Sequence, residues 1–137
     1  MKKKDKPEIS EVNQQVFRIA VASVAEAFDV NESDIVASRR RHDRKAKARQ
    51  MTYWLMRKGT ALSSIEIGAL FSEPKDHATI LNGEKVMEGV FEVGDIPENP
   101  FYKNSIKAAN LFNKVRREHI IARRKRFEEK IGEIIND

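Results

Sequence analysis

The chain has 137 residues and a formal net charge of +5, with 40% hydrophobic and 34% charged residues. These totals allow one domain with a modest apolar core plus tails, and the basic balance favours an anionic partner such as nucleic acid. The absence of cysteine excludes disulfides, thiolate metal sites and cysteine nucleophiles. No apolar run approaches the ~18–20 residues that span a bilayer and no signal peptide is evident, so we expect a cytoplasmic protein that does not contact membranes.

The N-terminal part predicts a tail followed by two helices. Residues 1–9 are charged and contain Pro7, which is typical of a flexible tail. Ser10 can cap a helix that ends at Phe28, because apolar residues recur at helical spacing between them. After a polar break, Asn31 or Ser33 could cap a short second helix.

A basic stretch follows at residues 38–49, which read SRRRHDRKAKAR and hold seven cations against one acid. Cations this close repel one another, and either solvent around a mobile loop or the phosphates of a nucleic acid can offset that repulsion. In the second case an arginine would insert into a minor groove. From about Lys47 a third helix is predicted to run to Lys58, with Gly59 as the glycine just beyond its end.

A helix-turn-helix is predicted next. Ser63 and Glu66 match the capping-box pattern that opens a short helix, residues 64–71. A turn containing proline follows, and Asp76 can cap a longer helix that ends at about Val90. In a helix-turn-helix the second helix enters the major groove with its N-terminal residues toward the base edges. The other interpretation is an ordinary helical hairpin with a solvated polar face.

The C-terminal part predicts a loop and one long basic helix, from about Tyr102 to Ile135. Two interpretations of this helix are open. Residues near heptad spacing could form a homodimer seam: Ile120, Phe127, Ile131 and Ile134. Alternatively the first half packs on the domain and the rest projects as a basic arm toward DNA; the packing residues would then be Ile106, Ala109, Phe112 and Val115.

No stretch alternates apolar and polar residues as a sheet strand does, so the fold class is predicted to be all-α. We divide the chain into a basic flexible tail, a helix-turn-helix domain, a loop and a basic C-terminal helix. Their bounds are 1–9, 10–91, 92–100 and 101–137.

The block from Val21 to Met87 resembles the C-terminal DNA-binding domain of the bacterial replication initiator DnaA, in the Trp-repressor-like helix-turn-helix superfamily. The matching segments come in the family's order: VAEAFDV, SDIVASRRR, KARQMTYWLMRK, LSSIEIGALF and KDHATIL. The last segment corresponds to the family signature Arg-Asp-His-Thr-Thr-Val. The resemblance implies a helix-turn-helix bundle that binds double-stranded DNA.

The resemblance also implies which residues contact DNA. The start of the recognition helix would meet base edges in the major groove, through Lys75, Asp76, His77, Ala78, Thr79 and Asn82. An arginine of the basic loop would enter the minor groove, among Arg39, Arg40 and Arg41. Phosphates would be met by Arg44, Lys47, Arg49, Gln50, Arg57 and Lys85.

The chain departs from the family in four ways. Ala78 replaces a threonine of the signature, Lys75 replaces its arginine, the turn 72–75 is one residue longer, and the family's paired glycines there are lost. These changes bear on which DNA sequence is recognised. The initiator's ATPase domain has no counterpart, since no GxxxxGK[ST] motif occurs, so no nucleotide is expected.

The predicted function is therefore sequence-preferring binding of double-stranded DNA, in a regulatory or accessory replication role within the nucleoid. No metal site is expected, because the three histidines show no metal-ligand spacing. No cofactor or catalytic group is expected either. Asp76 and His77 are neighbours on a helix and do not face each other as a catalytic pair would. Two alternatives stay open: a protein-interaction module that binds an acidic partner or replication factor, and binding of structured RNA.

Overall fold

The computed structural model describes residues 7–37, 43–94 and 99–135, and within these ranges the chain is helical without a strand. The all-α prediction is confirmed. The helices are α1 (Glu11–Phe28), α2 (Glu32–Val36), α3 (Asp43–Gly59), α4 (Ser64–Leu70), α5 (His77–Val93) and α6 (Pro100–Ile135). No helix of the described residues is long and apolar enough to cross a bilayer.

Helix α1 begins and ends as its sequence predicts. The side chain of Ser10 accepts a hydrogen bond from the backbone N–H of Asn13, 3.2 Å away. The helix stops at Asp29, whose backbone is left-handed at φ 54° and whose N–H donates to the carbonyl of Ala25. Aspartate tolerates this conformation better than most residues do, and the chain turns there toward α2.

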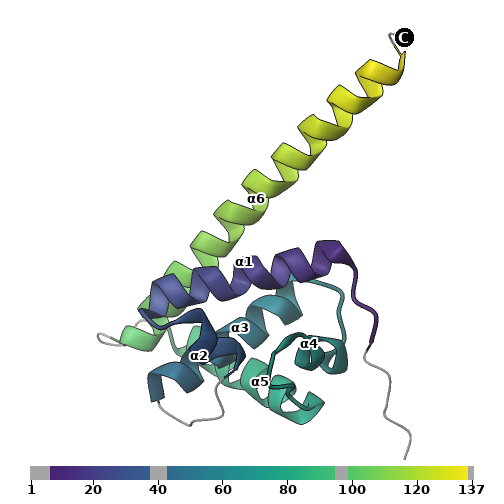
Figure 1. Ribbon diagram of the computed structural model, residues 1–137. Coiled ribbons are helices and arrows are strands. Elements are labelled where there is room, and N and C mark those ends of the chain that lie inside the picture. The colour runs from purple at the N-terminus through teal and green to yellow at the C-terminus, as the bar shows by residue number, and fades with distance from the viewer. Residues whose placement is uncertain (1–6, 38–42, 95–98, 136–137) are drawn as a thin grey trace, which may run out of the picture.

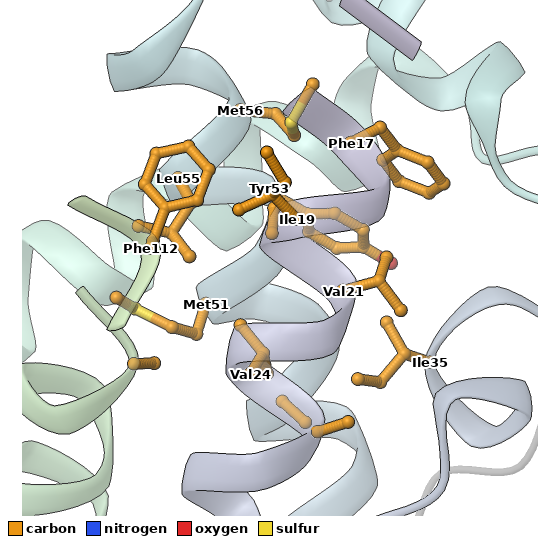
Figure 2. Close-up of a cluster of buried hydrophobic side chains, with 14 of the residues drawn as sticks. Phe17, Ile19, Val21, Val24, Ile35, Met51, Tyr53, Leu55, Met56 and Phe112 are labelled. Atoms are coloured by element: carbon orange, nitrogen blue, oxygen red, sulfur yellow. The ribbon is translucent and has the colours of Figure 1, made fainter. Parts of the chain in front are cut away.

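The hydrophobic core lies between α1 and α3 (Figure 2). Phe71, just after α4, has edge-to-face contacts with Phe17 of α1 and Tyr53 of α3, with ring centroids 5.0 and 5.2 Å apart. Burial raises the pKa of Tyr53 to about 12. The other helices each add one or two large buried side chains or alanines to this core: Ile35, Ile67, Ile80, Met87, Ala108 and Phe112.

Helix α6 has two halves with different surroundings. Its first half packs on α1, where Ser105, Ala108 and Phe112 are buried and the ring of Phe101 lies 6.0 Å from that of Phe28. The predicted packing of this half is confirmed in outline, with Ala108 rather than Ile106 at its centre. Beyond Arg116 nearly every side chain is exposed. We call residues 117–135 the arm.

The arm does not lie beside the helix-turn-helix of its own chain. Figure 1 shows it running past α1 on the side away from α4 and α5. Helix α6 starts near the C-terminal end of α5, where the rings of Phe91 and Tyr102 are 6.3 Å apart, and it then packs along α1 and is tied to α3 through Arg116 and Gly59. This direction does not favour the prediction that the arm reaches toward DNA held by its own domain.

Three predicted helix ends need correction. Helix α3 begins four residues before Lys47, since its first turn contains arginine and lysine, which are good helix formers. Helix α5 continues to Val93, and α6 begins at Pro100, because proline suits the first helical position.

The role of Gly59 also differs from the prediction. It is the last residue within α3, and among the described glycines only Gly94 has positive φ. A Cβ at Gly59 would lie 3.0 Å from Nη1 of Arg116 and 3.1 Å from the ring of Phe112. The glycine therefore makes room for α6, and Arg116 donates a 2.9 Å hydrogen bond to its carbonyl.

Candidate nucleic-acid interface

The connection between α4 and α5 is a tight turn held against α4. Ser63 and Glu66 form both hydrogen bonds of the predicted capping box. After α4, the backbone N–H of Lys75 donates to the carbonyl of Gly68, 3.0 Å away. A Cβ on Gly68 would overlap the carbonyl oxygen of Lys75, so only glycine allows this close approach. The turn thus fixes where α5 begins.

The N-terminus of α5 is exposed and capped. The carboxylate of Asp76 accepts a 2.8 Å hydrogen bond from the backbone N–H of Thr79, and hydrogen bonds from Thr79 lower the pKa of Asp76 below its usual value. His77, Ala78 and Thr79 are all exposed. His77 is therefore not a buried histidine that supports the turn.

Most of the residues predicted to read bases share this exposed surface of α5. Asn82 and Lys85 are exposed one and two turns beyond Ala78, while Lys75 is half-buried in the turn. The opposite side of the helix, at Ile80, Gly83 and Met87, is buried against α3 and its neighbours. The helix thus presents one free face whose residues have the donors and acceptors that base edges require.

The middle of α5 is fixed against α3. A Cβ on Gly83 would lie 2.5 Å from Cδ2 of Tyr53, so the two helices approach closely there. Glu84 pairs with Arg57 at 3.1 Å and with Lys58 at 3.7 Å. These contacts hold α5 in one orientation while leaving its N-terminus free.

A third ion pair lies one turn further along α5. Lys58 Nζ is 2.7 Å from the carboxylate of Glu88, which raises the pKa of Lys58 and lowers that of Glu88. Trp54 Nε1 donates to the same carboxylate at 3.3 Å, and the Trp54 ring packs on Phe91 with centroids 4.6 Å apart.

The residues predicted to bind phosphate have different surroundings. Arg44 and Lys47 are exposed at the start of α3; Arg44 lies 3.8 Å from the carboxylate of Asp29, and Lys47 Nζ is 5.2 Å from the ring centroid of Phe101. Gln50 is half-buried and Lys85 exposed. Arg39, Arg40 and Arg41 lie outside the described residues.

Arg49 and Arg57 are engaged within the protein. Arg49 is only 7% exposed, and its Nη1 donates a 2.9 Å hydrogen bond to the carbonyl of Asp34, which fastens α2 to α3. This placement favours a structural role for Arg49. Arg57 is half-buried and its Nε donates a hydrogen bond to Glu84, so its guanidinium would have to bind a phosphate and Glu84 at the same time.

One exposed apolar residue near this surface was not among the predicted site residues. Leu81 of α5 is 41% exposed. It lies beside His77 and Lys85 at helical spacing, which is the signal in the sequence that could have identified it. Its methyl groups can contact the methyl of thymine.

The described residues contain no group of three histidines, aspartates or glutamates that could hold a metal ion.

Comparison with known families identifies the central part of the chain. The model of the bacterial DnaA protein helix-turn-helix matches residues 19–86, from within α1 to within α5. The match includes the capped turn and the exposed N-terminus of α5, and leaves out α6. No curated protein and no solved structure matches the chain.

Proposed function

From the match of residues 19–86 to the bacterial DnaA helix-turn-helix family, we propose that the protein binds double-stranded DNA with a sequence preference. The observation that carries the proposal is the exposed, capped N-terminus of α5 on a helix otherwise fixed to α3. A rigid helix with a free end is what insertion into a major groove requires.

Base reading is assigned to the first two turns of α5. His77 and Asn82 can donate and accept hydrogen bonds at base edges, and the methyl of Ala78 can touch thymine. Asp76 can accept from cytosine N4 or adenine N6 while it caps the helix, and Thr79 and Lys75 flank this group. Because Ala78 lacks the hydroxyl of the family signature, we expect a preferred site that differs from the family's usual box.

Phosphate binding is assigned to the cations around that face. Arg44, Lys47 and Lys85 are exposed, and Lys85 lies on the same side of α5 as Asn82. Gln50 and Arg57 could join them where α3 meets α5. The basic loop would supply the minor-groove contact through Arg40 or Arg41, with Arg39 beside them.

The proposed role rests on the DNA-binding activity of helix-turn-helix domains and on the absence of a glycine-rich phosphate loop from this sequence. A helix-turn-helix binds DNA and is not catalytic, so we propose a regulatory or accessory replication factor of the nucleoid rather than an enzyme. The chain has no glycine-rich phosphate loop, and the proposal includes no nucleotide-driven step.

Salt dependence of duplex binding tests the proposal. Each phosphate contact contributes about 0.9 to the slope of log affinity against log salt, so roughly five or six contacts give a slope of about −4 to −6. A random-duplex selection in the same buffer should return a shared motif. Absence of duplex binding at low salt would overturn the proposal in favour of an acidic protein partner, and preference for structured RNA over duplex DNA would also overturn it.

A further inference from the structure

The arm carries an apolar stripe that nothing in its own chain covers. Its large apolar side chains are between 38% and 73% exposed: Ile120, Ile121, Phe127, Ile131, Ile134 and Ile135. The arm is a helix of about 28 Å that leaves the domain (Figure 1). A single helix of this length is marginally stable in water, and an exposed apolar stripe makes a partner favourable.

The stripe has the spacing of a coiled-coil seam. Ile120, Arg124, Phe127, Ile131 and Ile134 follow one another at alternating intervals of four and three residues. This alternation places all five on one side of the helix, at the positions that interlock between two helices. Four of the five are apolar, and Arg124 stands near the middle.

The charges along α6 indicate which partner fits. Residues 114–126 hold seven lysines and arginines and one acid, whereas residues 127–135 hold three acids and one lysine. Two parallel copies would place the basic segments side by side, whereas two antiparallel copies would place each basic segment against the other's acidic one. Charge complementarity therefore favours an antiparallel second copy.

The central arginine agrees with this orientation. Pairing Ile120 with Ile131 of the second copy puts Arg124 beside Phe127 of the second copy, on both sides of the two-fold axis. A guanidinium stacks favourably on an aromatic face. In the parallel arrangement the two copies of Arg124 would face each other across the seam.

We infer that the arm is an antiparallel dimerisation helix for a second copy of this chain. The two helix-turn-helix domains then lie at opposite ends of the paired arms, so that one dimer can hold two separate duplex segments. The dimer itself does not depend on DNA, whereas the bridging of two duplexes rests on the proposed function.

Measuring mass in the absence of DNA tests the dimer. Sedimentation equilibrium of the full chain, from micromolar to millimolar concentration, should show a monomer–dimer equilibrium. Phe127→Gln combined with Ile131→Gln should weaken it at least about tenfold, because glutamine keeps helix propensity and net charge but removes apolar area. The matched control is Val12→Gln with Val93→Gln, two exposed apolar residues outside the arm that should leave the equilibrium unchanged.

Single cysteines test the orientation, since the chain has none of its own. A mixture of Ile120→Cys and Ile131→Cys chains should form the mixed disulfide under mild oxidation. Ile120→Cys alone should not, because in the antiparallel register its two copies are eleven residues, roughly 16 Å, apart along the helix. A monomer at every concentration, or rapid disulfide formation by Ile120→Cys alone, would overturn the inference.

Bridging is measured separately, by capture of a second labelled duplex on beads that carry the first. A dimer that binds one duplex but never two would contradict bridging and leave DNA binding standing. Loss of capture of the first duplex would instead count against the proposed function.

Discussion

Replacing His77 with alanine separates base reading from structural support. His77 is the first residue of α5, its side chain is exposed, and the cap between Asp76 and Thr79 does not involve its imidazole. Alanine is the best helix former, so the free energy of unfolding should change by no more than about 0.5 kcal/mol. If the imidazole contacts a base edge, specific binding should weaken by about 1–3 kcal/mol, which is roughly 5- to 150-fold.

The control is Ile80→Ala, one turn further along the same helix. Ile80 is fully buried, so its truncation leaves a cavity and should reduce folding stability by about 2–5 kcal/mol. Its specific and non-specific binding should fall together, and only to the extent that the protein unfolds. His77→Ala should instead lose specific affinity while binding to unrelated duplex stays nearly unchanged.

Two measurements check this: denaturant unfolding for stability, and duplex titration at one fixed salt concentration for both kinds of binding. Parallel loss of specific and non-specific affinity in a destabilised His77→Ala protein would refute the base-reading role. Unchanged specific affinity in a stable variant would refute it equally, and would move base reading to Ala78, Thr79 and Asn82.

Three further predictions concern the turn, the cap and the basic loop. Gly68→Ala should destabilise the fold by about 1–3 kcal/mol in denaturant unfolding, because its Cβ overlaps the carbonyl of Lys75. The control Gly89→Ala, in the exposed part of α5, meets nothing within 4 Å and should stabilise the fold by about 0.5–1 kcal/mol. Equal effects of the two variants on stability would contradict the requirement for glycine at the turn. Folding lowers the pKa of Asp76 below its ordinary value of 3.8, so the cap stabilises the fold fully above pH 3.8 and less as the pH falls through the lowered pKa. The difference in unfolding free energy between wild type and Asp76→Ala should disappear over that range. A difference that persists in stronger acid would contradict the cap assignment. Replacing Arg40 and Arg41 with alanine should reduce the preference for A·T-rich flanking sequence in a duplex selection, whereas replacing Arg123 and Arg124 should not; if the two pairs behave alike, the loop supplies only charge.

The local features of this fold could be predicted because their causes lie within a few residues. Ser10, the Ser63–Glu66 box and Asp76 cap the helices that follow them, and each is recognisable from its own hydroxyl or carboxylate and the apolar pattern behind it. The exposed face of α5 could likewise be predicted, since helical spacing separates Ala78, Asn82 and Lys85 from the buried Ile80.

Features that depend on distant contacts could not be predicted. Arg49 looks like one more cation of a basic run, and only its hydrogen bond to the carbonyl of Asp34, fifteen residues away, favours a structural role. The direction of α6 depends on contacts between residues more than fifty positions apart, such as Arg116 with Gly59. The close approach that requires Gly68 becomes visible only when the turn is folded back on α4.

The two ends of α5 have different surroundings, and under the proposed function this difference would allow the base-contacting surface to change without loss of the fold. The stability of the helix depends on its buried side and on the ion pairs of Glu84 and Glu88 with α3. Ala78 contributes to neither, because it lies exposed at the free end. If α5 contacts bases as proposed, exchange of a hydroxyl-bearing residue for alanine at this position alters the chemistry offered to a base edge while the packing stays intact. The same fold could then be kept while the preferred DNA site changes.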